Sequence, residues 1–312
     1  METYKSAQDF NGERNTVITI GTFDGVHVGH RKIIQRLMDS AAHNDLETAV
    51  LTFFPHPRMV VQKDSDIKLI NTIEERKSLL AQTGLQHLIV HPFTMEFSRL
   101  TAEDYVKDIL VEQLQAKKVI IGYDHHFGRN RKANIEDLKR YGDQFGFEVE
   151  EISKHDVDDV GVSSTKVRKA LSMGDMERAN TYLGHPFMLS GKINRGKGLG
   201  RKMNYPTANL SIEENYKIIP SKGVYVVQAV LKDVLHYGMM SIGTNPTVGG
   251  KELSIETYFF DFNEDLYDEY LEVQLLKRIR DEKNFSNIDE LIKAMEADET
   301  FSREYISNLN AK

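Results

Sequence analysis

The chain has 312 residues, of which 40% are hydrophobic and 28% are charged, and it contains 7 prolines. This length suits two domains of ordinary size, and the composition is that of a folded globular protein rather than a disordered or collagen-like one. Lys and Arg number 40 against 47 Asp and Glu, which gives a net charge of −7 and no overall basic surface for nucleic acid. Any phosphate binding must therefore come from local loops.

The sequence contains no cysteine, which excludes disulfides, thiolate nucleophiles and cysteine-ligated metals and suits a reducing cytoplasm. The segment METYKSAQDF lacks the apolar stretch of a secretory signal, and no apolar run approaches the ~18 residues that span a bilayer. We therefore expect a cytoplasmic protein without membrane or nucleic-acid partners. The sequence indicates no particular oligomeric state.

In the first half of the chain, predicted strands alternate with predicted helices. Helices are predicted by apolar spacing from Ile33 to Ala41, by a capping box at Thr72, and by helix-start residues at Thr101 and Asn134. Runs of β-branched and apolar residues predict strands at residues 16–20, 49–54, 85–90, 118–122 and 147–152. This alternation of five strands with helices predicts a parallel sheet covered on both faces, with ligands at the carboxyl ends of the strands.

Two short helices are predicted next, at residues 164–173 and 175–183, and the second ends at Gly184. The pattern then changes to strands separated by Gly, Pro, Asn and Asp turns, which is typical of an antiparallel barrel or sandwich. These strands are expected at residues 187–193, 223–230, 237–243, 253–260 and 270–276. A last helix at 287–306 should cover the barrel. We predict two domains, 1–184 and 185–312.

The segment GTFDGVHVGH lies between the first strand and its helix, where backbone N–H groups and the helix dipole favour an anion. Its glycines have neither the dinucleotide-binding spacing nor that of a P-loop. His27 and His30 are three residues apart at a helix start, so both side chains should point the same way. Two imidazoles in that position would be able to donate to one nucleotide.

H-x-G-H after a first strand is the signature of the nucleotidyltransferase superfamily, and GTFDGVHVGH closely resembles its flavin adenylyltransferase version. Three further segments resemble that family: Phe53–Pro57, which reads F-x-P-H-P, then Phe127–Arg131, and Gly161–Arg168 with the sequence GVSSTKVR. The resemblance implies a Rossmann-like domain in which the FMN phosphate attacks the α-phosphorus of ATP and pyrophosphate leaves. Positioning and charge stabilisation would supply the catalysis.

The resemblance assigns transition-state stabilisation to His27, His30 and Arg168. Hydroxyls at a helix start and a planar guanidinium both suit phosphate oxygens. Contacts to ATP and its phosphates are expected from Gly21, Phe23, Asp24, Gly29, Ser163, Ser164 and Thr165. FMN is expected to lie near Asp124 and Phe127.

In the second domain, residues 191–210 contain four glycines and five basic residues, which precede the tetrapeptide Pro-Thr-Ala-Asn at 206–209. Such a loop suits either a cationic flap over phosphates or a solvated hairpin. The tetrapeptide resembles the riboflavin kinase motif, which implies that Thr207 and Asn209 contact Mg²⁺ and ATP phosphates. Their oxygens are the donors that Mg²⁺ prefers. Gly198 and Arg201 are also expected at the phosphates.

Glu256 lies in the middle of a predicted strand, and the resemblance makes it the base that accepts the proton of the ribityl hydroxyl. Arg280 and Phe285 resemble the family's flavin-side loop. The whole resemblance, over about residues 15–290, is to bacterial bifunctional riboflavin kinase/FAD synthetases. It implies a Greek-key barrel with a terminal helix that makes FMN from riboflavin and ATP, and an N-terminal domain that makes FAD.

Two stretches depart from the family pattern. Met203-Asn204-Tyr205 stands where the family usually has Leu-Gly-Phe, and His125-His126 stands where an aromatic followed by a basic or polar residue is common. Three alternatives remain at this point: only one active domain, a flavin-binding regulator without activity, or a nucleotidyltransferase for another phosphorylated acceptor. The last would leave the kinase-like barrel unexplained.

Overall fold

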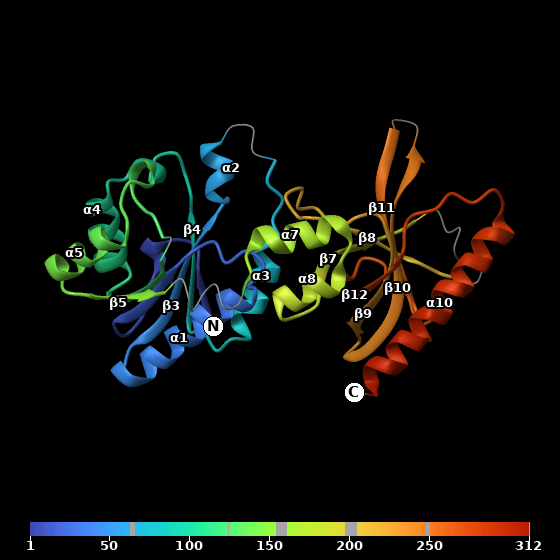
Figure 1. Cartoon of the computed structure of the whole chain (residues 1–312), viewed down its shortest axis with the longest axis horizontal. Coiled ribbons are helices and arrows are strands. Elements are labelled where there is room, and N and C mark those ends of the chain that lie inside the picture. Colours follow the sequence, from blue (N-terminus) through green and yellow to red (C-terminus); the bar gives the residue numbers. More distant parts are fainter. Residues whose placement is uncertain (63–65, 124, 154–160, 197–204, 248–249, 312) are drawn as a thin grey trace. The chain divides into compact units, whose positions relative to one another are not determined.

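A computed structural model describes residues 1–62, 66–123, 125–153, 161–196, 205–247 and 250–311 (Figure 1). The contacts within the chain define two compact units, Met1–Ser164 and Thr165–Lys312. The division by contacts thus falls ahead of the two short helices, whereas the sequence pattern changes after them. Among the described residues, no helix combines the length and the apolar character needed to cross a bilayer.

The first unit is built on a parallel sheet of six strands, in the order β1-β4-β3-β2-β5-β6. Its strands are β1 (Glu2–Tyr4), β2 (Thr16–Ile20), β3 (Glu47–Phe54), β4 (His87–Pro92), β5 (Ala116–Gly122) and β6 (Glu148–Ile152). The five predicted strands are confirmed. The number five is wrong, because the short segment Glu2–Tyr4 pairs with β4 and adds a sixth strand at the edge.

Helices connect these strands at their predicted places, and α2 is an additional helix that was not predicted. They are α1 (Val28–Asn44), α2 (Pro57–Val61), α3 (Ile73–Ala81), α4 (Ala102–Asp104), the π-helix η3 (Tyr105–Gln113) and α5 (Ile135–Phe145). Short 3-10 turns are η1 (Ala7–Asp9), η2 (Phe97–Arg99) and η4 (Arg129–Arg131). The capping box of Thr72 and Glu75 and the N-caps at Thr101 and Asn134 are confirmed.

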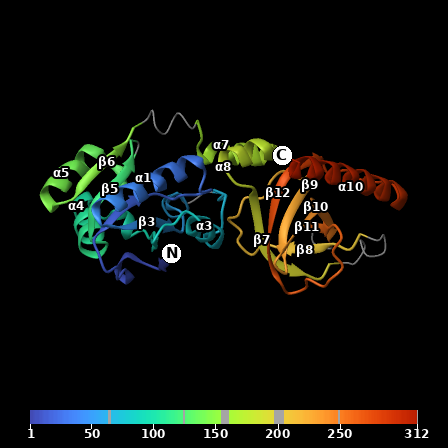
Figure 2. The ribbon, with the colours of Figure 1, turned by 90° about the horizontal axis from the view of Figure 1, so that it is seen from below.

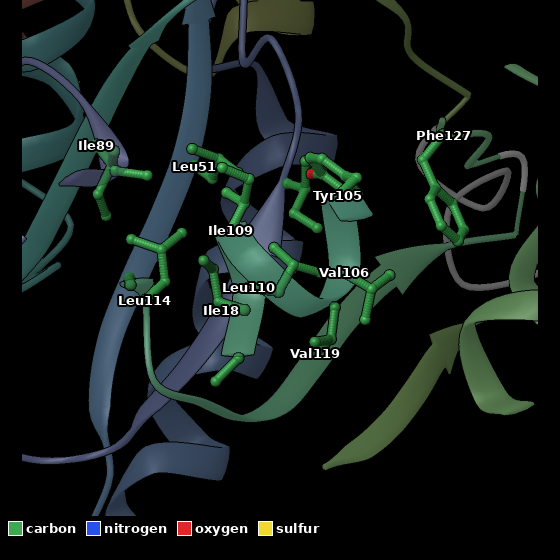
Figure 3. Close-up of a cluster of buried hydrophobic side chains, with 14 of the residues drawn as sticks. Ile18, Leu51, Ile89, Tyr105, Val106, Ile109, Leu110, Leu114, Val119 and Phe127 are labelled. Carbon is green, nitrogen blue, oxygen red and sulfur yellow. The ribbon is translucent and has the colours of Figure 1, made fainter. Parts of the chain in front are cut away.

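One hydrophobic cluster of the first unit lies between the sheet and η3. Ile18, Leu51 and Val119 come from three neighbouring strands and meet Val106 and Leu110 of η3 (Figure 3). The connection from β2 through α1 to β3 and the connection from β4 through η3 to β5 run in opposite directions across the sheet. Because crossovers are right-handed, connections that run in opposite directions lie on opposite faces of the sheet. The direction of the connections changes beside β2. The loop after β2 therefore lies at the switch point where ligands bind.

The second unit begins with α7 (Ser164–Met173) and α8 (Met176–Leu183), which match the prediction. Asp175 is the N-cap of α8, and Gly184 ends it with a φ of 73°. Asn180 on α8 joins two barrel strands, because its side chain donates to Leu275 O at 2.9 Å and accepts from Phe187 N–H at 2.8 Å. These bonds tie α8 to the barrel.

The barrel is closed and antiparallel, with the strand order β10-β11-β8-β7-β12-β9. Its strands are β7 (Phe187–Asn194), β8 (Ala208–Ser211), β9 (Gly223–Leu231), β10 (Val234–Thr247), β11 (Gly250–Phe259) and β12 (Tyr270–Arg280). Strands β9, β10 and β11 follow one another and β12 returns beside β9, which is a Greek key. The predicted Greek-key barrel is confirmed, with β8 as an additional strand.

The last helix, α10 (Ile288–Asn310), lies along the outside of the barrel (Figure 1 and Figure 2). Met295 and Ile306 on this helix pack with Tyr205, Met239 and other apolar residues of the barrel. The predicted terminal helix is confirmed and extends beyond its predicted end.

Candidate active sites

The loop between β2 and α1 has a strained backbone. Phe23 and Val26 have φ values of 48° and 40°, in a region that residues other than glycine rarely adopt. Gly25 between them has a φ of 93°. Each such non-glycine residue costs on the order of 1–3 kcal/mol, and this kind of strain gathers at functional sites. The strain was not visible in the sequence, and it supports a functional role for the loop.

The two histidines of this loop face each other. His27 is the N-cap of α1, and its Nδ1 accepts the backbone N–H of His30 at 3.3 Å. The two rings are stacked, with centroids 3.6 Å apart and planes 13° from parallel. Gly29 permits this arrangement, because a Cβ atom there would lie 3.2 Å from the His27 ring. The expectation that both side chains point the same way is therefore confirmed.

The surroundings favour a neutral His30, and the hydrogen bond at His27 Nδ1 leaves Nε2 as the donor of that ring. Since His27 Nδ1 accepts a hydrogen bond, the proton of a neutral His27 is on Nε2. Burial, the neighbouring His27 and the positive charge of Arg76 hold the pKa of His30 well below its ordinary value of 6.5. The ring of Phe23 covers His30 from another side, at 5.0 Å between centroids. Donors at the N-terminus of α1 are what a phosphate oxygen requires.

The Ser-Ser-Thr segment reaches the same loop through Ser164, whose Oγ donates to the backbone oxygen of Asp24 at 2.9 Å. Ser163 is exposed. Thr165, exposed, and Arg168, half-buried, belong to α7 of the second unit. Gly21, at the end of β2, lies against the Phe23 ring, which a Cβ atom would approach to 3.1 Å.

Of the two expected flavin residues of the first unit, Phe127 is buried. Phe127 is 6% exposed, forms a strand-like bridge with Ala133, and packs against Tyr105 at 5.8 Å between ring centroids (Figure 3). Asp124 lies outside the described residues. In the adjacent pair that departs from the family pattern, His125 is half-buried and His126 is exposed.

In the barrel, strands β8 and β11 bring the predicted kinase residues together. Glu256 is directly opposite Asn209 in the strand register. The Glu256 carboxylate accepts two hydrogen bonds, from Thr207 Oγ1 at 3.1 Å and from Ser254 Oγ at 2.8 Å. A Cβ atom on Gly196 would lie 2.3 Å from Asn209 Nδ2, so the glycine-rich loop touches this site at its described end. Gly198 and Arg201 fall outside the described residues.

A cavity of about 510 Å³ opens beside Thr207. Its apolar wall includes Phe259, Phe262 and Leu266, and the side next to β8 includes Pro206 and Thr207. The lining also includes polar and acidic side chains, among them Asn263, Glu264 and Asp265, so the pocket combines apolar and polar walls around a volume that can hold a flat organic ring.

The flavin-side loop after β12 is held by α10. Arg280 donates to Asp298 from Nε at 2.9 Å and from Nη2 at 2.7 Å. Its guanidinium carbon lies 5.6 Å from the centroid of the Phe285 ring. The structure thus brings these two predicted residues together, and it adds Asp298, which no sequence signal indicated.

The part of the chain that the structure describes holds no cluster of three or more His, Asp or Glu residues arranged for a metal ion. Mg²⁺ does not require one, because it commonly binds through one or two protein oxygens together with substrate phosphates and water. Thr207 Oγ1 and Asn209 Oδ1 are oxygen donors of that type. The two residues therefore fit a magnesium ion that arrives with a nucleotide.

A parallel sheet with a histidine loop at its switch point, followed by a closed barrel with Thr, Asn and Glu side chains, defines a two-domain nucleotide-dependent transferase. The family model described as FAD synthetase matches residues 9–166, and the one described as riboflavin kinase matches residues 183–306. The bifunctional riboflavin kinase/FMN adenylyltransferases of Listeria monocytogenes and Escherichia coli are similar to this chain. They are 35% and 34% identical over 95% and 94% of it, and over 94% and 93% of their own lengths.

A solved structure shows the same likeness at the level of the fold. The crystal structure described as a macrolide-efflux protein from Streptococcus pneumoniae covers 97% of this chain and 98% of its own, at 32% identity and a TM-score of 0.87. The chain belongs to the family of bifunctional riboflavin kinases/FMN adenylyltransferases. It is an enzyme of two-step FAD synthesis, and the alternatives of a single active domain or an inactive regulator are not favoured.

Proposed function

We propose that the two steps are divided between the domains, with adenylyl transfer in residues 1–184 and phosphorylation of riboflavin in residues 185–312. The matches of the two family models support this order. The observation that carries the proposal is that the histidine pair lies in one compact unit and the Thr207–Glu256 pair in the other. Free riboflavin is then the first acceptor and FMN the second.

In the adenylyltransferase domain, the FMN phosphate attacks the α-phosphorus of ATP and pyrophosphate leaves. His27 and His30 donate hydrogen bonds to the phosphate oxygens that gain charge in the transition state. The stacked rings at the N-terminus of α1 support this role, since a helix N-terminus favours an anion. Ser163, Ser164, Thr165 and Arg168 contribute hydroxyls and a cation to the triphosphate.

In the kinase domain, Glu256 accepts the proton of the ribityl 5′-hydroxyl as that oxygen attacks the γ-phosphorus of ATP, and ADP leaves with the bridging oxygen. The hydrogen bonds from Thr207 and Ser254 support this role, because they fix the carboxylate in one orientation. Thr207 and Asn209 would hold Mg²⁺, which would neutralise phosphate charge. The adenine ring of ATP occupies the cavity beside Thr207, where the Phe259 and Phe262 side chains can contact a purine. The sequence contains no cysteine, which is compatible with both reactions taking place in the reducing cytoplasm.

Two variants separate the two steps. We expect His30→Ala to convert riboflavin to FMN and then stop, so that FMN accumulates. Glu256→Gln should lower FMN formation by roughly 10²-fold or more and still convert supplied FMN to FAD. Chromatography of the products from riboflavin or FMN, with ATP and Mg²⁺, measures both.

Exposed residues of the same type provide matched controls. His43→Ala on α1 and Glu269→Ala in the barrel domain replace exposed side chains and should leave both steps unchanged. If His30→Ala forms FAD at the normal rate, the assignment of the first domain is wrong. If Glu256→Gln phosphorylates riboflavin normally, the assignment of the base is wrong.

A further inference from the structure

A buried aromatic side chain directly precedes the Pro-Thr-Ala-Asn segment of the barrel. Tyr205 is only 9% exposed, although it lies in a connecting segment and not in a strand. Its ring packs edge to face against Tyr258 of β11, with the ring centroids 5.0 Å apart and the planes 71° from parallel. Aromatic pairs of this geometry stabilise a contact beyond the area that they bury. Tyr205 therefore anchors the start of the segment to β11.

Alternate residues of this segment contact alternate residues of β11. Thr207 Oγ1 donates to the Glu256 carboxylate at 3.1 Å, and the Tyr205 ring contacts Tyr258. Alternate residues of a strand share a face, so Glu256 and Tyr258 lie on the same face of β11. The ring of Pro206, between the two contacts, fixes its own φ at about −65° and removes one rotation from the chain that joins them. A displacement of Tyr205 would therefore carry Thr207 away from Glu256.

A hydrophobic cluster encloses Tyr205 on the side of α10. The cluster joins Tyr205 to barrel residues that include Met239, and Met295 and Ile306 of α10 pack against it. Burial, and after it the carboxylate of Glu299 on α10, raises the pKa of Tyr205 to about 12. The hydroxyl therefore keeps its proton at neutral pH and adds no buried charge to the cluster.

We propose that Tyr205 is a positioning residue of the kinase reaction, which holds the Thr207 hydroxyl within hydrogen-bonding distance of the Glu256 carboxylate. This inference rests on the proposed role of Glu256 as the base. Tyr205 acts through Thr207 and by packing, not by contact with a substrate. Its aromatic ring carries this role, because the ring makes the contact with Tyr258.

The test is a double-mutant cycle in the full-length protein. Tyr205→Leu removes the aromatic ring and keeps an apolar side chain, Thr207→Val removes the hydroxyl, and a further variant carries both changes. A residue that acts through the Thr207 hydroxyl loses its effect on catalysis once that hydroxyl is gone, whereas a residue that only stabilises the barrel keeps its effect. Initial rates of riboflavin phosphorylation give kcat and KM, and thermal unfolding gives the stability of each protein.

We expect Tyr205→Leu to lower kcat about tenfold when Thr207 is present and less than about twofold in the Thr207→Val background. KM for riboflavin should change less than kcat. Tyr205→Phe should keep the wild-type kcat, because it retains the edge-to-face ring.

Tyr237→Leu is the matched control, since it removes another aromatic ring that packs on the same cluster. It should lower the unfolding temperature and leave kcat unchanged in both backgrounds. Conversion of supplied FMN to FAD should be the same in all variants, which verifies that the first domain is folded.

The inference is overturned if Tyr205→Leu leaves kcat unchanged, or if it lowers kcat by the same factor with and without Thr207→Val. If Tyr205→Leu does not fold, Tyr205→Met, whose flexible side chain can fill more of the space of the ring, takes its place in the cycle. Normal riboflavin phosphorylation by Glu256→Gln would overturn the proposed base instead. The cycle would then still measure whether Tyr205 acts through Thr207.

Discussion

Arg280 at the end of β12 and Asp298 on α10 form a bidentate ion pair, with Arg280 Nε 2.9 Å from Asp298 Oδ1 and Nη2 2.7 Å from Oδ2. Asp298 is only 4% exposed. Paired parallel hydrogen bonds fix the plane of a guanidinium as well as its position. The terminal helix thus sets the direction of Arg280 and of the loop that follows it.

Asp298→Ala should weaken riboflavin binding by the kinase domain, because Arg280 loses the partner that orients it. We expect a rise in KM for riboflavin of roughly tenfold, or about 1.4 kcal/mol, with a smaller change in kcat. Steady-state phosphorylation measures both constants. Asp289→Ala, an exposed residue in the first turn of the same helix, should leave KM unchanged. If Asp298→Ala and Asp289→Ala have the same KM for riboflavin, the Arg280–Asp298 ion pair has no role in riboflavin binding.

Thr207→Val keeps the shape of the side chain and removes the hydroxyl that donates to Glu256. Glu256 then loses one of the two bonds that orient it, and the phosphates lose an oxygen donor. Riboflavin phosphorylation should fall by about 10–100-fold, whereas Thr207→Ser should retain most of the activity. Product formation at saturating Mg²⁺ and ATP is the measurement. Equal loss in Val and Ser variants would show that the methyl group, not the hydroxyl, is needed.

Gly29→Ala should impair adenylyl transfer without destabilising α1. The added Cβ would lie 3.2 Å from the His27 ring and displace it from its stack with His30. Alanine favours a helix over glycine by about 1 kcal/mol, so the helix itself should not suffer. We expect roughly tenfold slower conversion of FMN to FAD and an unchanged rate from riboflavin to FMN. An undisturbed rate of FAD formation would mean that the stacked arrangement is not required.

The first unit should lose stability in mild acid. His91 is 6% exposed, its Nδ1 accepts the N–H of Ala7 at 3.0 Å, and burial lowers its pKa below 6.5. The unfolded chain then takes up a proton near pH 6.5 that the folded chain takes up only at lower pH. Stability from this group is complete above pH 6.5 and falls as the pH drops below it.

Calorimetry of the unfolding temperature at pH 7.5 and pH 5.5 measures this effect. In His91→Asn the amide oxygen can accept the same N–H and does not titrate, so the difference between the two pH values should shrink. His43→Asn, which changes an exposed histidine, should keep the wild-type difference. If the unfolding temperature of His91→Asn changes between the two pH values as much as that of the wild type, groups other than His91 cause the acid sensitivity.

Much of the fold was predictable because its signals are local. The capping box of Thr72, the N-cap of Asn134 and the glycine after Leu183 each depend on a few neighbouring residues, and each is confirmed. The strands β1 and β8 were not predicted, since three or four residues are too short to show a period of two. Their pairing depends on the sheets they join.

The motif residues of both sites could be predicted from the sequence. The buried charged residues that pair with them could not. The spacing of His27 and His30 on one helix turn predicted that they lie together, whereas Glu256 and Asn209 meet only because the barrel closes. The partners Arg76 and Asp298 lie on helices remote in sequence from Asp24 and Arg280. Nothing in a single sequence distinguishes such buried charges from ordinary exposed ones.

The two sheets differ in their edge strands, and this difference affects aggregation at high protein concentration. The barrel is closed, so its ladder returns on itself. The parallel sheet ends at β1, which has three residues, and at β6, whose five residues EVEEI include three glutamates. Short and charged edges are poor templates for a strand from another molecule. Concentrated enzyme should therefore resist aggregation through added strands, and uncharged β-branched residues at those glutamates would remove this protection.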